Sequence, residues 1–154
     1  MKHIRKYRDF YNNIKYRTNV FEWYPFKEDA KLLYVGDSAI LESYFVQRFK
    51  CCSTSLSTLD LIKDTDFDYI IVDGEFDCID DKESSLYSLL NKLDLNGQLI
   101  ILTNNKLALR YFAGVKEFES DEFFGHLKKN TNLYSKNQWD TLFSKLKVHA
   151  QYYY

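Results

Sequence analysis

The sequence has a single proline, few glycines and no long apolar run. Pro25 is the only proline among 154 residues, and it favours an extended conformation for Tyr24, just before the first predicted strand. None of the five glycines follows the Gly-x-Gly-x-x-Gly spacing of a nicotinamide-binding loop. No apolar run approaches the roughly 20 residues that span a bilayer, and the basic start lacks the apolar segment of a secretory signal. We therefore expect a cytoplasmic protein without membrane insertion.

Cysteine is scarce, and the charges nearly balance. Cys51, Cys52 and Cys78 are odd in number, and none belongs to a Cys-x-x-Cys or Cys/His pattern. This favours reduced thiols over disulfides or a zinc site. The histidines show no ligand spacing either, which favours surface or packing roles for His3, His126 and His149. A net charge of −1 argues against a dedicated nucleic-acid-binding protein.

The charge is unevenly distributed, because the N-terminal stretch is basic and aromatic. Residues 2–17 contain six basic side chains and only one acidic residue, Asp9. Apolar residues recur there at helical spacing, namely Ile4, Tyr7, Tyr11 and Ile14. We predict a basic, aromatic helix over residues 1–19, with its charges in water, ahead of an α/β domain over residues 20–154. Binding of an acidic partner or a membrane surface is the alternative.

Further along the chain, the periodicity alternates between strand and helix. Apolar runs predict strands at 31–37, 67–74 and 98–105, a weaker one at 51–57 and a final one at 147–154. Helices are predicted at 38–49, 81–97, 106–114 and 135–146, and residues 118–134 give no clean period. This order is typical of an α/β fold with a mainly parallel sheet flanked by helices.

Local signals mark the helix ends. N-caps are predicted at Ser38 or Asp37, at Asp80 or Asp81, and at Ser135, and C-terminal glycines at Gly97 and Gly114. The two tryptophans, Trp23 and Trp139, are expected to bury their rings in the core or its rim. In open parallel sheets, ligands bind beyond the carboxyl ends of the strands. Five residues are expected along that edge: Gly36, Asp37, Ser57, Asp73 and Gly74.

Four segments carry a family resemblance: FEWYPFKEDAKLLYVG, FDYIIVDG, LNGQLIILTNNKLALRYFAG and YSKNQWDTLF. Together they resemble class I S-adenosylmethionine-dependent methyltransferases, particularly a bacterial branch associated with cell-surface glycan synthesis. The resemblance covers about residues 20–154, and NNKLALRYFAG is its most specific part. It implies a Rossmann-like methyltransferase fold, S-adenosylmethionine as cofactor and a link to cell-surface polysaccharide synthesis.

The resemblance implies a cofactor site at Gly36, Asp37, Ser55 and Asp73, but the family pattern is incomplete there. Tyr34 stands at the family's acidic position, and only Gly36 remains of its glycine loop. Ser55 stands where the family has a carboxylate that binds both ribose hydroxyls, and a serine cannot make that bidentate contact.

The chain also leaves no room for the family's third strand. Only nine residues, 58–66, separate the weak strand from the next one, whereas a crossover that contains a helix needs ten to twelve or more. We therefore predict that this strand, which walls the adenine pocket, is missing.

These three losses predict a non-catalytic binding or scaffold module that takes no cofactor and serves a protein partner or a linked catalytic domain. An active methyltransferase with an atypical loop is the alternative. The terminal QYYY either packs on the chain's own sheet or belongs to one domain of a longer protein.

Two other motifs suggest a chemistry, and each also has a simpler structural explanation. VGDSAI resembles the Gly-Asp-Ser block of GDSL-type esterases, but no Asp-x-x-His accompanies Ser38, so a helix cap is favoured. The acidic stretch 73–81, DGEFDCIDD, could hold a divalent cation. Cys78 stands where a calcium loop requires glycine, so we expect no metal and a solvated loop.

Overall fold

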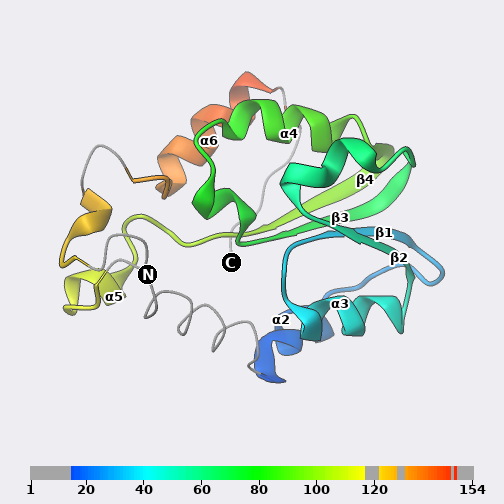
Figure 1. Ribbon diagram of the computed structural model, residues 1–154, viewed down its shortest axis with the longest axis horizontal. Coiled ribbons are helices and arrows are strands. Elements are labelled where there is room, and N and C mark those ends of the chain that lie inside the picture. The colour runs from blue at the N-terminus through cyan, green and yellow to red at the C-terminus, as the bar shows by residue number, and fades with distance from the viewer. Residues whose placement is uncertain (1–14, 117–121, 128–130, 147, 149–154) are drawn as a thin grey trace.

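The computed structural model describes residues 15–116, 122–127, 131–146 and 148 (Figure 1). Its strands are β1 (Lys31–Val35), β2 (Lys50–Thr54), β3 (Phe67–Asp73) and β4 (Leu93–Leu102). All pair in parallel, in the order β2-β1-β3-β4. The predicted α/β class is confirmed, and this sheet with flanking helices is consistent with a Rossmann-like fold. The predicted strand at 147–154, apart from Val148, and residues 1–14 of the predicted N-terminal helix lie outside the described residues.

Helices cover both faces of the sheet. The α-helices are α2 (Asn19–Glu22), α3 (Ala39–Val46), α4 (Lys82–Leu90), α5 (Leu109–Phe112) and α6 (Lys136–Lys145). Short 3-10 helices are η1 (Lys15–Thr18), η2 (Leu56–Leu61), η3 (Glu75–Cys78) and η4 (Gly125–Leu127). Figure 1 shows α2 and α3 on one face of the sheet and α4 and α6 on the other. The chain is therefore layered helix, sheet, helix.

Alternation along the two central strands produces two core clusters. Leu33 and Ile70 point to one face and pack with side chains of η2, η3, α4 and α6. Tyr34 and Ile71 point to the other face and pack with side chains of α2 and α3. Successive side chains of a strand point to opposite faces, so two covered faces require the uninterrupted apolar runs that the sequence has.

The predicted helix caps are largely confirmed. Ser38 Oγ accepts a hydrogen bond from Leu41 N at 3.5 Å, and Asp81 Oδ1 accepts one from Ser84 N at 3.0 Å. At the start of α6, Gln138 Oε1 accepts from Ser135 N at 2.9 Å. After α5, Gly114 adopts a φ of 87°, a value that favours glycine.

The prediction that Gly97 ends a helix was wrong. The helix stops at Leu90, and Gly97 lies within β4. Phe67 pairs with Leu93, but Tyr69 pairs with Gln98, so β4 bulges between these two pairs. A Cβ on Gly97 would lie 2.6 Å from Phe67 O. Gly97 therefore allows a close backbone approach inside the sheet, which helical spacing could not reveal.

The connection from β2 to β3 spans residues 55–66 and is longer than the predicted 58–66. Between Thr54 and Phe67, a stretch that is fully described, the chain forms η2 and no strand. The weak strand itself ends at Thr54, so the prediction that it continues to residue 57 was wrong; Ser57 belongs to η2. Leu59 is buried and joins the same core cluster as Trp139, so η2 serves as a cover for that face of the sheet.

The two tryptophans differ in burial. Trp139 is buried and stacks on Phe143 with ring centroids 5.5 Å apart, as predicted. Trp23 is 57% exposed, so the prediction of a buried ring was wrong there. Its neighbour Tyr24 packs instead, at 4.7 Å from the Phe26 ring. Among the described residues, no helix combines the length and apolar character needed to cross a bilayer.

Candidate functional site

The strand order places a switch point between β1 and β3. The chain leaves β1 toward β2 on one side and later returns to β3 on the other side. In open parallel sheets, ligands bind at such a point, beyond the carboxyl ends of the strands. Val35 pairs with Val72, so the next residues, Gly36 and Asp73, meet at this edge.

The Tyr34 hydroxyl occupies the space beside Gly36. Tyr34 is fully buried on the face covered by α3, and its ring lies 5.7 Å from that of Phe45. The hydroxyl donates to Asp73 Oδ2 at 3.1 Å and accepts from Ser38 N at 3.1 Å. It therefore uses both a carboxylate oxygen and an amide that a ligand at this edge could otherwise bind.

Gly36 itself is closely surrounded. A Cβ at this position would lie 2.7 Å from Tyr34 Oη and 3.0 Å from Asp73 Cβ. Position 36 therefore has to be a glycine, because Tyr34 and Asp73 fill the space that a Cβ would take. Gly36 N also donates to the carbonyl oxygen of Thr54, the last residue of β2, at 3.0 Å, which continues the pairing with β2 one residue past the end of β1.

Arg17 closes the same site from the N-terminal side. Its guanidinium donates to Asp73 Oδ1 and forms an ion pair with it. The Asp73 side chain is 2% exposed, whereas that of Arg17 is 23% exposed. The prediction that the basic stretch keeps its charges in water was therefore wrong for Arg17, because a buried carboxylate attracts a cation that reaches it.

Burial controls the ionisation of this cluster. Desolvation raises the pKa of Asp73, while the Arg17 charge and the Tyr34 hydrogen bond act in the opposite direction. Desolvation and the Asp73 charge raise the pKa of Tyr34 far above its usual range, so the hydroxyl keeps its proton and remains a donor. The three side chains thus form a closed, internally satisfied unit.

The other two predicted site residues stay apart from this unit. Ser55 lies at the end of β2, one strand further along the edge, and its hydroxyl is 2.8 Å from Ser57 Oγ and 2.9 Å from Thr58 Oγ1. Asp37 is exposed, and its charge raises the Asp73 pKa. The structure therefore brings Gly36 and Asp73 together and leaves Ser55 in a separate cluster of hydroxyls.

The acidic stretch 73–81 is not the solvated loop that the sequence suggested. Asp77 is buried within η3 and accepts from the Thr103 hydroxyl and from Asn104 N, the latter at 3.1 Å. Burial raises its pKa, against the effect of these hydrogen bonds. Among the described residues, no three metal-ligating side chains form a group. Asp77 instead ties η3 to the loop after β4.

The Asp77 contacts extend into residues 104–114, which include α5. Asn104 Nδ2 also donates to Asp77, and Arg110 donates to the Asn104 side chain. Arg110 further donates to the Tyr111 hydroxyl at 2.9 Å, and Tyr111 is buried. This chain of hydrogen bonds fixes α5 to the carboxyl edge of the sheet.

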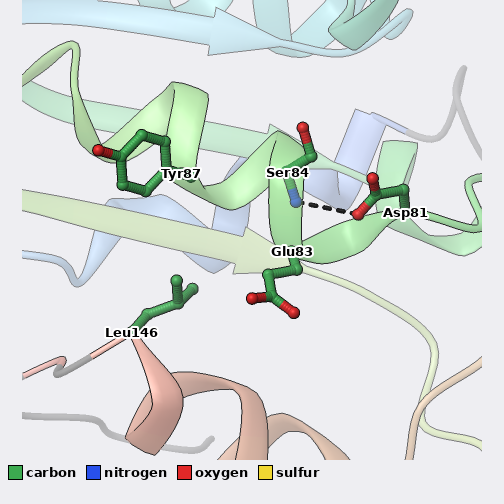
Figure 2. A pocket seen from close by; sticks show the side chains of 5 residues that line it. All are labelled: Asp81, Glu83, Ser84, Tyr87 and Leu146. Atoms are coloured by element: carbon green, nitrogen blue, oxygen red, sulfur yellow. Dashed lines mark hydrogen bonds between the residues drawn. The ribbon is translucent and has the colours of Figure 1, made fainter.

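A shallow hollow of about 380 Å³ lies elsewhere, between α4 and the end of α6. Figure 2 shows its lining of Asp81, Glu83, Ser84, Tyr87 and Leu146. Asp81 caps α4, and Glu83 pairs with Lys145 at 2.6 Å. The hollow contains none of the four predicted site residues, so we take the switch point, where Gly36 and Asp73 meet, as the candidate site.

Sequence reasoning missed three participants in the two polar clusters: Arg17, Asp77 and Asn104. Arg17 and Asp73 are 56 positions apart, and no local pattern links them. Asp77 looks like any residue of an acidic loop. The one available signal is Tyr34, a polar-tipped residue in an apolar strand, because a buried tyrosine hydroxyl usually needs a partner.

Comparison with known proteins gives no family assignment. No family model, no curated protein and no solved structure matches the chain.

Proposed function

We propose that this chain is a non-catalytic binding module with a Rossmann-like fold, whose cofactor crevice is filled by its own side chains. One observation carries the proposal: Tyr34 Oη lies 2.7 Å from where a Cβ on Gly36 would be. In the methyltransferases that the sequence resembles, bare backbone at this turn approaches the cofactor. Here the hydroxyl fills that space and takes the amide of Ser38.

Two further features support a closed site. Asp73, the carboxylate at the switch point, already binds Tyr34 and Arg17. Ser55 replaces the carboxylate expected for the ribose, and its hydroxyl lies among those of Ser57 and Thr58. A ligand would have to displace several hydrogen bonds and an ion pair before it gained any of its own.

Calorimetric titration with S-adenosylmethionine and S-adenosylhomocysteine tests the proposal. We expect no saturable heat up to about 1 mM, the upper end of ordinary enzyme affinities. A working S-adenosylmethionine-dependent methyltransferase, titrated in the same buffer, is the positive control. A link to cell-surface polysaccharide synthesis rests on the sequence resemblance alone and is a separate part of the proposal.

If the natural chain does bind one of these compounds, the Asp73→Asn variant shows whether binding occurs at the switch point. If the natural chain binds either compound at micromolar concentration and Asp73→Asn does not, the switch point holds a working cofactor site. That outcome would overturn the proposal and favour an active methyltransferase with an atypical loop.

A further inference from the structure

We propose that Asp73 and Tyr34 form a guanidinium-binding site that Arg17 occupies from within the same chain. An arginine-containing ligand would bind there when Arg17 moves away. This inference rests on the proposed function, since it names the ligand chemistry of a crevice that no longer takes a cofactor.

The difference in exposure between Arg17 and Asp73 indicates how a ligand would reach Asp73. The Asp73 side chain is 2% exposed and that of Arg17 is 23% exposed, so Arg17 extends from the partly exposed surface down to a buried carboxylate. Withdrawal of its side chain would open a path to Asp73. Asp73 would then lose the charge that lowers its pKa, so a replacement cation would compete with a proton for the carboxylate.

The hydration of the two cations favours a guanidinium over an ammonium group at this buried carboxylate. Tyr34 holds Asp73 Oδ2 through a 3.1 Å hydrogen bond, which fixes the orientation of the carboxylate and leaves Oδ1 facing Arg17. A guanidinium is planar and more weakly hydrated than an ammonium, so it loses less on entering a buried site. The hydroxyl thus acts as a positioning group for the carboxylate.

Arg17 is carried by a short segment that packs against α3. It lies in η1, a single turn of 3-10 helix, followed by α2, which has only four residues. Helices this short have little stability of their own. Phe21, which is 2% exposed and lies 5.0 Å from the Phe45 ring, anchors the segment from α2. Arg17 precedes this anchor, so it can leave the site while Phe21 stays in the core.

The test is chemical rescue of Arg17→Ala in the full chain. Thermal unfolding is followed with added methylguanidinium, with tetramethylammonium at equal concentration as the control cation that cannot donate hydrogen bonds. At about ten times its dissociation constant, methylguanidinium should raise the Tm of Arg17→Ala by about 4 °C. The natural chain, with Arg17 in place, should gain less, as should the Arg17→Ala/Asp73→Asn double variant.

Arg17→Lys serves if Arg17→Ala does not fold, because it keeps the charge but loses the planar group. It should also gain more from methylguanidinium than the natural chain does. N-acetylarginine methylamide, used as a second probe, tells whether the guanidinium head is sufficient or whether the rest of an arginine residue adds affinity. Tighter binding of this second probe would favour an arginine side chain of a protein partner.

Equal shifts with and without Asp73, or with either cation, would overturn the inference. That result is distinct from failure of the proposed function, which requires the natural chain to bind S-adenosylmethionine or S-adenosylhomocysteine.

Discussion

Tyr34 decides, through a single hydroxyl group, what the carboxyl edge of the sheet can hold. Its ring belongs to the apolar core, while its oxygen contacts Asp73 and Ser38. A phenylalanine would pack in the same strand but would leave the carboxylate and the amide without this partner. Tyr34 therefore packs in the core and also closes the crevice.

The first prediction concerns Gly36→Ala. The new Cβ would meet Tyr34 Oη at 2.7 Å and Asp73 Cβ at 3.0 Å, so we expect a loss of about 1–3 kcal/mol in the free energy of unfolding. Urea denaturation measures this loss. In the Tyr34→Phe background the same substitution should cost less, because the closest atom is gone. Equal losses in both backgrounds would show that the hydroxyl is not the obstacle.

The second prediction concerns the pH dependence caused by Asp77. Burial raises its pKa above the usual 3.8, so the folded chain binds this proton more tightly than the unfolded chain. The contribution of Asp77 to the free energy of unfolding should therefore fall as pH rises from about 3.8 through the raised pKa. The Asp77→Asn side chain cannot lose a proton. The variant's free energy of unfolding should therefore fall below that of the natural chain by less at pH 7 than at pH 4.

Thr103→Val is the control for Asp77→Asn. It removes one donor to the carboxylate but keeps the titrating group, so the loss of stability with rising pH should persist. Urea denaturation at both pH values gives the comparison. If the loss of unfolding free energy in Asp77→Asn grows with pH, the folded state prefers the charged carboxylate.

At the scale of elements, local signals explain where helices begin better than where they end. Asp81 caps α4 and Ser38 caps α3, and each cap acts within three residues of its own position. The end of α4 depends on β3, because the chain must turn into a strand that pairs with it. The glycine at position 97 is therefore required by the neighbouring strand β3 and not by the end of α4.

The third prediction tests the cap of α4. Asp81→Ala removes the acceptor of Ser84 N, 3.0 Å away, and should lower the free energy of unfolding by about 1 kcal/mol. Asp80→Ala is the matched control: it makes the same change of charge one residue earlier, where the side chain is exposed. Chemical denaturation of both variants should separate the cap from the charge, and equal losses would argue against the cap.

At the scale of the whole molecule, apolar surface gathers away from the sheet. Among the residues that the structure describes, half of the large apolar side chains that are exposed come from two stretches, namely Leu107, Leu109, Phe112, Val115, Phe123, Phe124 and Leu127. The Lys116 ammonium lies 5.4 Å from the centre of the Phe123 ring, which brings the two stretches together. Figure 1 shows α5 beyond the end of β4, to one side of the layered core. Clustered apolar surface of this kind promotes association.

The fourth prediction is that this surface drives self-association at high concentration. Leu109 is 85% exposed and Phe112 is 54% exposed, so the Leu109→Lys/Phe112→Ser variant should lower the mass measured by light scattering in concentrated solution. Its Tm should stay close to that of the natural chain. Leu95→Lys is the control, since Leu95 is 96% exposed on the β4 bulge. An equal effect of Leu95→Lys would point to net charge instead.

The sequence alone determined the layered α/β architecture, because apolar periodicity and helix caps act over a few residues. The spacing of the two strands also argued against a further strand between β2 and β3, although the link, residues 55–66, is longer than predicted and contains η2. Only the tertiary structure decided that Arg17 reaches Asp73, that Tyr34 fills the space beside Gly36 and that Gly97 lies in a strand. These contacts join residues from separate elements, and their geometry follows from strand order and register, which no local pattern encodes.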